Sequence, residues 1–153
     1  MNRILFTFFW MFTVIPGNFS YGQGIASGLN ANDCLELFYI NSNNNLCYRQ
    51  QSKPGGDWSD EFVYLDTVNR VYLEKNPDNS LELFYIDQDN DLYRARKDLP
   101  GNDWFPGDLF RKNVIAICII PNSDEHLQMF YLLEDQSVKY RKQTNSEGIW
   151  SDE

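Results

Sequence analysis

The chain has 153 residues and a formal net charge of −9, from 22 acidic and 13 basic residues. Nucleic acid and anionic lipid repel a chain this acidic, so neither is expected as a partner. Because His126 is the only histidine, the composition argues against a serine–histidine catalytic triad and a multi-histidine metal site. We expect no cofactor and no bound metal.

The first 22 residues have the pattern of a secretory signal peptide. Residues 1–3 form a short, positively charged start, residues 4–16 carry no charge, and Ser20 and Gly22 suit a signal peptidase. The uncharged run is shorter than the roughly 20 apolar residues of a membrane span. A cleaved signal is therefore favoured over membrane insertion and over a buried N-terminal strand. We predict a secreted protein with one domain at residues 23–153, whose net charge is −10 (12 basic minus 22 acidic residues).

Three cysteines, Cys34, Cys47 and Cys118, make an odd number without a CxxC spacing. This excludes a disulfide scaffold. Two arrangements remain open, one disulfide with one free thiol or three buried thiols, and the sequence does not decide the pairing.

An internal repeat of 46 residues is the strongest feature of the sequence. The run LELFYI that begins at Leu35 occurs again at Leu81 and, as LQMFYL, at Leu127. The tryptophans of the mature chain keep the same spacing: Trp58, Trp104 and Trp150. Three ungapped copies at one period fix the fold class before any local detail does.

Each copy of the repeat predicts about four β-strands. The LELFYI run is aromatic and aliphatic and is too short for a typical helix. A polar turn follows in each copy, at residues 41–45, 87–91 and 134–137. A short apolar strand comes next, which indicates a hairpin. Both alternating faces of the run are largely apolar, so the sheet is expected to be covered on both sides. Glu36 is the polar exception, repeated as Glu82 and replaced by Gln128.

The predicted fold class is all-β, and two architectures fit. One is β-propeller-like, with three 46-residue, four-stranded blades at about residues 25–68, 71–114 and 117–153, the last incomplete. The other is a β-trefoil, whose threefold repeat would close with three copies. A closed propeller has about 4–8 blades, which favours the trefoil. The four-strand unit with one tryptophan near its end favours the propeller.

The second copy contains DNSLELF from Asp78, DNDLY from Asp89 and PGNDW from Pro100. With these motifs it resembles one blade of the bacterial and fungal fucose-binding propeller lectins and of tectonin-like propellers. The resemblance covers essentially all of residues 25–153 and implies saccharide binding in clefts between neighbouring blades. Some of these lectins grip the sugar through an arginine in the second strand. This chain departs from that pattern with Glu36, Glu82 and Gln128.

The resemblance also implies a route to ring closure, because two-blade lectins of this group assemble into closed rings. We expect either a piece of a longer propeller or a homo-oligomer, such as a six-blade dimer, that covers the open sheet edges.

Sugar binding needs an aromatic face for the apolar side of the ring and planar charged or amide groups for its hydroxyls. The candidate ligand-binding residues are Glu36, Glu82, Arg49, Arg94, Arg141, Trp58, Trp104 and Trp150. Each type also has a structural interpretation. The tryptophans could close their blades, the glutamates could hydrogen-bond the backbone of the neighbouring blade, and the arginines could pair with acids of the next repeat.

Two other functions fit the sequence poorly. Residues 87–98 imitate a calcium loop, but they have Leu92 where that loop needs glycine and Asp98 where it needs glutamate. Paired carboxylates could serve glycoside hydrolysis, but the same acid in two copies indicates multivalent binding rather than one catalytic centre. The sequence therefore predicts a secreted, multivalent, non-catalytic lectin for fucosylated or related glycans. A secreted module for protein–protein interaction is the alternative.

Overall fold

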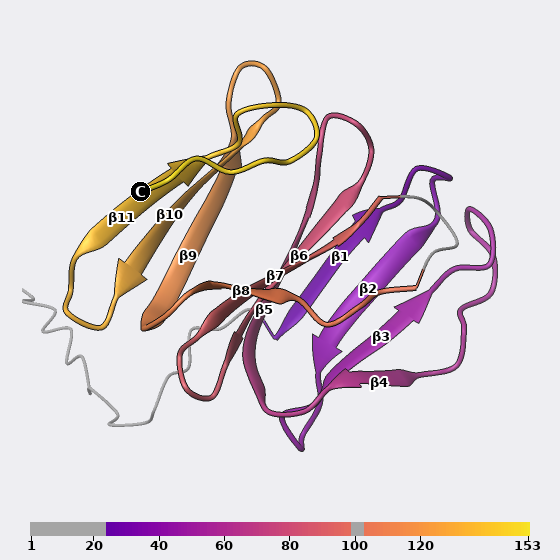
Figure 1. The fold of residues 1–153 in the computed structure, drawn as a ribbon. Helices are drawn as coiled ribbons and strands as arrows, with labels where there is room; N and C mark the ends of the chain where they lie inside the picture. The colour runs from indigo at the N-terminus through magenta and orange to yellow at the C-terminus, as the bar shows by residue number, and fades with distance from the viewer. Residues whose placement is uncertain (1–23, 99–102) are drawn as a thin grey trace, which may run out of the picture.

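A computed structural model describes residues 24–98 and 103–153, and these residues form eleven β-strands and no α-helix (Figure 1). The predicted all-β class is confirmed. The predicted signal peptide, residues 1–22, lies outside the described residues. Within the described part of the chain, no helix could cross a membrane.

The strands form three separate antiparallel sheets, one from each copy of the repeat. The first sheet has the order β1 (Ile25–Leu29), β2 (Leu35–Ile40), β3 (Leu46–Gln50) and β4 (Phe62–Leu65). The second has β5 (Val68–Lys75), β6 (Leu81–Asp87), β7 (Leu92–Lys97) and β8 (Asp108–Arg111). The third has β11 (Val138–Lys142), β10 (Leu127–Leu133) and β9 (Val114–Pro121). The described strands close no barrel, so the threefold closure of the trefoil alternative is not observed.

The polar turns close the hairpins by bonding their own backbone. Asp87 Oδ1 accepts hydrogen bonds from the backbone N–H groups of Asp89 and Asp91, each at 2.9 Å. Asn90 has a φ of +61°, which asparagine tolerates in such turns. Asn41 makes the corresponding bonds in the first copy. The segment that imitates a calcium loop is therefore a hairpin turn whose first carboxylate bonds the turn itself.

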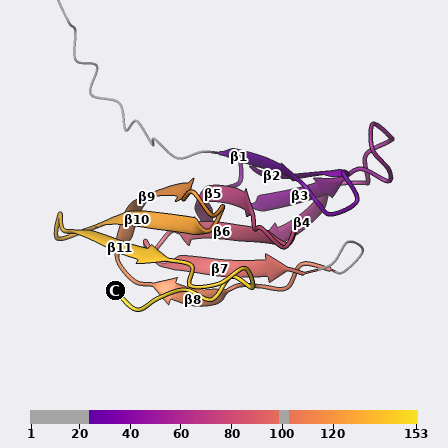
Figure 2. The same ribbon diagram turned by 90° about the horizontal axis from the view of Figure 1, so that it is seen from above.

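Apolar layers hold the three sheets together face to face (Figure 1, Figure 2). In the first layer, Phe38 and Leu46 of the first sheet pack with Val71, Leu83 and Trp104 of the second. The second layer uses residues 46 positions further along the chain, among them Phe84, Leu92, Met129 and Tyr131. The repeat in sequence is thus a repeat of one packing interface.

Each sheet consequently has two different faces. We call the face that packs on the next sheet the forward face; in the first sheet it carries Glu36, Phe38, Leu46 and Tyr48. We call the other the backward face. In the second sheet it carries Val71, Leu81, Leu83, Tyr85 and Trp104. The alternation along β2 and β6 separates the two sets, as the sequence predicts.

All three cysteines are free. Cys34 and Cys47 are buried, whereas Cys118 is exposed on β9. Neither open arrangement is therefore observed, since there is no disulfide and one of the three thiols is accessible.

The inter-sheet layer can be tested with a matched pair of leucines in the second sheet. Leu92 is 0% exposed and Leu109 is 48% exposed. Leu92→Ala should lower the free energy of unfolding by about 2–5 kcal/mol, because it leaves a cavity in the second layer. Leu109→Ala should change it by no more than about 0.5 kcal/mol. Urea denaturation measures both, and equal losses would contradict the assigned packing.

Candidate functional site

A cleft of about 640 Å³ opens between the first and second sheets. The first sheet and its β3–β4 connection line it with Tyr48, Gln50, Ser59, Asp60, Glu61, Phe62 and Tyr64. The second sheet and its β7–β8 connection add Asp103, Trp104 and Phe105. The volume lies in the range of about 300–1,000 Å³ that is typical of small-molecule sites.

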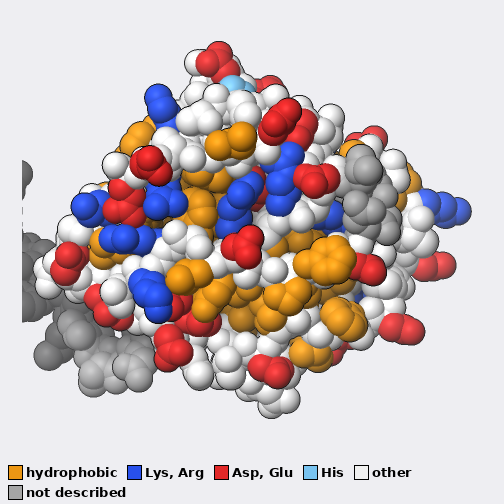
Figure 3. Space-filling model, viewed as in Figure 1, with side chains coloured by type: hydrophobic (Ala, Val, Ile, Leu, Met, Phe, Trp, Pro, Cys, Tyr) orange, Lys and Arg blue, Asp and Glu red, His pale blue; other side chains and the backbone are white. Residues whose placement is uncertain are grey.

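Exposed aromatic rings and carboxylates share the cleft. Phe62 and Phe105 are 61% and 72% exposed, although rings of this size are usually covered. Asp60, Glu61 and Asp103 also line it, and no lysine or arginine is among the described residues that line it. Figure 3 shows apolar side chains gathered in a band on the side of the molecule where these two sheets lie, with acidic side chains beside them. The cleft thus offers flat apolar surface next to hydrogen-bond acceptors.

The fully buried Glu36 joins the two sheets next to the cleft, where it contacts the lining residues Tyr48 and Trp104. Within its own sheet it accepts hydrogen bonds from Asn30 Nδ2 at 2.9 Å and from the Tyr48 hydroxyl at 3.0 Å. From the second sheet, Lys97 Nζ and Trp104 Nε1 each donate to it at 2.8 Å. A carboxylate without solvent needs such partners, and here an ammonium group and three further donors supply them.

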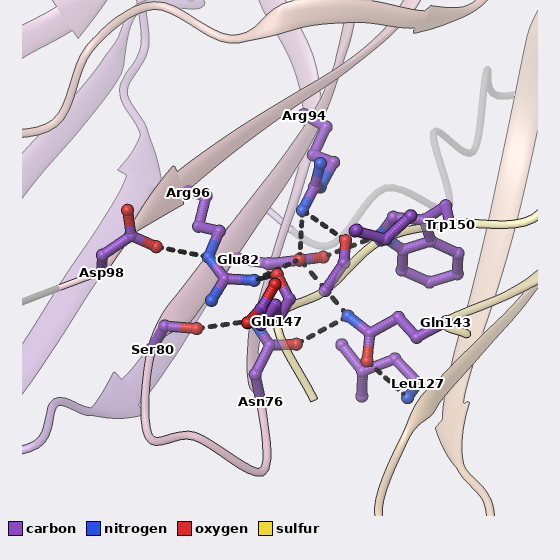
Figure 4. A network of polar contacts seen from close by, with 12 residues as sticks. Asn76, Ser80, Glu82, Arg94, Arg96, Asp98, Leu127, Gln143, Glu147 and Trp150 are labelled. Carbon is purple, nitrogen blue, oxygen red and sulfur yellow. Dashed lines mark hydrogen bonds and ion pairs between the residues drawn. The ribbon is translucent and has the colours of Figure 1, made fainter. Parts of the chain in front are cut away.

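We call Glu36 and the side chains that donate to it the Glu36 node. Glu82 forms the equivalent Glu82 node 46 residues later, between the second and third sheets (Figure 4). Its carboxylate accepts hydrogen bonds from Arg94 Nη2 at 2.5 Å, Trp150 Nε1 at 3.2 Å and Gln143 Nε2 at 3.3 Å. Arg96 Nη1 lies 3.9 Å away. The tryptophan of each following copy therefore donates to the glutamate of the copy before it.

The second junction differs from the first at the positions that line the cleft. Arg94 and Arg96 stand where the first junction has Tyr48 and Gln50. Arg94 Nη2 donates to the Gly148 carbonyl at 2.8 Å, and Arg96 Nη1 donates to the Glu147 carbonyl. A side chain at Gly148 would collide with Arg96. The two guanidinium groups thus bridge from the second sheet to the third where the first junction is open.

The eight predicted ligand-binding residues do not meet in one site. Trp104 lines the cleft and also donates to Glu36, while Trp58 is 37% exposed on the first sheet. Trp150 packs edge-on against Phe84 at 5.8 Å between ring centres. Glu36 and Glu82 bond the neighbouring sheet, as their structural interpretation expects, but they bond its side chains and not its backbone. Ligand contact by these residues stays a prediction.

The three predicted arginines have different surroundings. Arg94 belongs to the Glu82 node, and Arg49 Nε donates to the Ser59 carbonyl at 2.8 Å. Arg141 lies over the Phe110 ring, 4.7 Å from its centre, and 3.7 Å from Glu153 Oε1. Arg94 and Arg141 each pair with an acid of their own copy rather than of the next one, and none of the three arginines is among the described residues that line the open cleft.

Sequence reasoning missed most of the cleft lining, including Tyr48, Phe62 and Phe105. One signal was available: Ser59-Asp60-Glu61 recurs as Ser151-Asp152-Glu153, a repetition of polar residues outside the strands. The serines have a structural role, because Ser59 Oγ and Ser151 Oγ each accept a hydrogen bond from a strand backbone N–H. The repeated acids of this connection are the part of the signal that indicates a functional surface.

The pKa values of three tyrosines in or near the cleft are raised. Burial, together with the Glu36 carboxylate, raises the pKa of Tyr48 well above its usual range. Burial does the same to the pKa of Tyr64. On the other face of the sheet, a hydrogen bond to Glu61 raises the pKa of Tyr39 to about 12. These hydroxyls are hydrogen-bond donors at any physiological pH.

No protein-family profile and no curated protein sequence matches the chain. Solved structures do match its fold. A BP39L lectin from Burkholderia pseudomallei is 11% identical with a TM-score of 0.66, and 86% of this chain aligns with 40% of that one. A mutant of AofleA from Arthrobotrys oligospora is 13% identical with a TM-score of 0.58, over 86% of this chain and 41% of that one.

Enzymes share the fold as well. An exo-β-1,3-galactanase from Clostridium thermocellum is 11% identical with a TM-score of 0.55, over 85% of this chain and 36% of that one. The chain thus spans less than half the length of each of these three structures. At such identities the likeness shows a shared fold, found in a lectin and in a carbohydrate-active enzyme alike, and does not decide between binding and catalysis.

The pairing of Glu36 with Lys97 predicts that the fold loses stability when only one of the two residues is changed. Glu36→Gln leaves the Lys97 ammonium, in a residue only 4% exposed, without its anion, and should lower stability by about 3–5 kcal/mol. Adding Lys97→Gln should restore more than half of this loss, because glutamine stands at the same place in the other copies as Gln51 and Gln143. A double-mutant cycle by urea denaturation measures the coupling. Additive losses would contradict the pairing.

The raised tyrosine pKa values predict a loss of stability in alkali. Because the folded-state pKa of Tyr48 lies above the unfolded value of about 10, its contribution is complete below pH 10. The contribution is lost as the pH rises further, since only the unfolded chain releases the proton readily. Urea midpoints between pH 8 and pH 11 should fall, and the slope should be smaller in Tyr48→Phe. An unchanged slope in that variant would rule out Tyr48 as the group responsible.

Proposed function

We propose that this protein is a non-catalytic lectin that binds saccharides in the open cleft between its first and second sheets. The supporting observation is the pairing of exposed rings, Phe62 and Phe105, with the acceptors Asp60 and Asp103 in one cavity. A sugar presents an apolar C–H face, which suits an aromatic ring, and hydroxyl groups, which donate to carboxylates.

The expected propeller-like architecture belongs to the same proposal. Three stacked four- or three-stranded sheets with one interface repeated between them are what blades of a propeller would be. The open cleft is then an inter-blade cleft, as the resemblance to fucose-binding and tectonin-like propellers implies. The signal-like residues 1–22 support secretion, in which case glycans outside the cell are the available partners.

The charge of the cleft narrows the class of sugar. The described part of the lining has three carboxylates and no cation, which makes the cavity unfavourable for sialylated, uronic or sulfated groups. Neutral saccharides fit, and fucosylated glycans are neutral at the fucose. One shallow cleft of this kind binds weakly, so a homo-oligomer that repeats it would raise the avidity by about 10²–10⁴.

Catalysis has less support than binding. The two glutamates that the repeat duplicates, Glu36 and Glu82, are fully buried and already accept hydrogen bonds from protein donors. Neither is free to move a proton on a substrate, as a glycosidase carboxyl must. We assign the cleft carboxylates Asp60, Glu61 and Asp103 to hydrogen bonds with sugar hydroxyls, so incubation with glycans should release no sugar.

The cleft predicts which variants lose glycan binding. Phe62→Ala and Phe105→Ala should each weaken binding on a glycan array at least tenfold, because aromatic anchors dominate such contacts. Both side chains are mostly exposed, so the fold should be unaffected. Leu109→Ala, which removes an exposed side chain outside the cleft, is the matched control and should bind like the wild type.

Competition with free monosaccharide separates the lectin from its alternative. A lectin is released from a glycan resin by the free sugar. A protein-binding module with the same exposed rings would give a blank array and would hold its partner in the presence of sugar. That result would replace the lectin by the interaction module.

A further inference from the structure

The forward face of the third sheet is uncovered. Phe130 is 40% exposed, whereas Phe38 and Phe84, at the same position of the first and second copies, are 0% exposed. Val138 is 65% exposed, whereas its counterpart in the second copy, Leu92, is 0% exposed. No described residue packs on this face as the second and third sheets pack on those before them.

The backward face of the first sheet is uncovered in the same way. Ile25 is 62% exposed where Val71 of the second copy is 0% exposed. Trp58 is 37% exposed where Trp104 is 8% exposed. Leu35, Leu37 and Tyr39 are half-buried, whereas their counterparts in the second copy are buried. No described residue lies against this face as the first sheet lies against the second.

These two uncovered faces are the two halves of an interface that the chain already forms twice. A forward face carries a phenylalanine and an aliphatic residue, and a backward face carries aliphatic residues and a tryptophan. We propose that a second copy of this chain covers them, with the forward face of the third sheet of one copy on the backward face of the first sheet of the other. The arrangement deepens the proposed function and rests on its propeller-like architecture.

The polar residues of this junction are matched as well. Gln128 stands in the place of Glu36 and Glu82, and the Tyr140 hydroxyl donates to its Oε1 at 3.0 Å, as Tyr48 does to Glu36. The second copy would present the indole N–H of Trp58 and the amide of Gln51 to it. Gln51 corresponds to Lys97 of the first internal junction.

The exchange of Glu for Gln occurs at the one copy whose forward face is uncovered. A carboxylate there would lose its hydration each time two copies met, whereas an amide carries no charge to desolvate. The neutral pair Gln128 and Gln51 therefore suits a junction formed between separate molecules. The charged pair Glu36 and Lys97 serves a junction that is formed once, during folding.

The number of sheets fits closure by two copies. A contact between two different faces is heterologous, and it yields a ring only when the rotation closes. Two copies with three sheets each give six blades, which lies within the range of about 4–8 for closed propellers. Three copies would give nine and exceed it.

Closure would also complete a new cleft. Part of the lining of the open cleft recurs where the copies meet, with Tyr140, Ser151, Asp152 and Glu153 from one copy in the places of Tyr48, Ser59, Asp60 and Glu61. Lys142 and Ser59 stand where the open cleft has Gln50 and Phe105, so the new cleft is more polar. Asp57 and Trp58 of the other copy take the places of Asp103 and Trp104. The second internal junction lacks this set and has Arg94 and Arg96 instead. The second copy thus contributes residues to a saccharide site that neither copy has alone.

Light scattering on the purified chain, expressed in full length, tests the association. The wild type should have twice the mass of one chain. Val138→Asp on the forward face or Ile25→Asp on the backward face should shift it to one chain, with a dissociation constant at least tenfold higher. The matched control is Leu109→Asp, since Leu109 is 48% exposed even in the middle sheet, and it should stay dimeric. Circular dichroism confirms that each variant is folded.

Mixing the two disrupted variants tests the head-to-tail geometry. Val138→Asp and Ile25→Asp should each be monomeric alone, because each variant spoils both junctions of its own ring. Mixed in equal amounts they should form a heterodimer, because one of its two junctions then joins an unaltered forward face to an unaltered backward face. An interface between two identical faces would instead leave one variant dimeric by itself.

Three results would overturn the proposal. They are a folded wild type with the mass of one chain, a dimer that survives Val138→Asp and survives Ile25→Asp, and an assembly of three or more copies. None of these measurements involves a sugar, so they are independent of the lectin proposal. If the dimer forms and glycan binding fails, the assembly stands and the function falls. If binding succeeds, Tyr140→Phe and Tyr140→Ala should reduce the number of sugars bound per chain only in the dimer.

Discussion

A buried carboxylate ties each sheet to the next, and the stack depends on it. Apolar layers such as that around Phe38 hold the sheets together but allow them to slide, since hydrophobic contact has no direction. The Glu36 carboxylate accepts bonds from Lys97 and Trp104 of the following sheet, and these bonds have fixed lengths and directions. The node therefore sets the register between sheets, and the repeat conserves it at Glu82.

The same node leaves one junction open and fills the other. At the first junction, Lys97 of the second sheet supplies the positive charge for Glu36. Tyr48 stands at the strand position that Arg94 has in the second copy, and it lines the open cleft. Where glutamine takes the place of lysine, Arg94 supplies the positive charge and its guanidinium group crosses the gap to the third sheet. The counter-charge thus comes from different strand positions at the two junctions, and at the second junction its guanidinium group reaches across to the third sheet.

The sequence allowed the sheets to be predicted but not the cleft. Strands and hairpins follow from the alternation in LELFYI and from Asx turns such as that at Asp87, and both are local. The partners of Glu36 from the second sheet lie 61 and 68 residues away, so its role as a bonded structural group could not be separated from a ligand contact in advance. Phe62 and Phe105 become cleft residues only through the approach of two sheets. Their exposure follows from packing and has no local pattern.

The middle sheet is the most deeply buried of the three sheets. Six of the seven residues of β6 are buried, whereas β11 has no fully buried residue and β1 has none. Backbone amides exchange with solvent through local opening, and opening is easiest where few apolar contacts are broken. The protection of the backbone therefore decreases outward from β6 in both directions, so that the surfaces on either side of the stack are also its most easily opened parts.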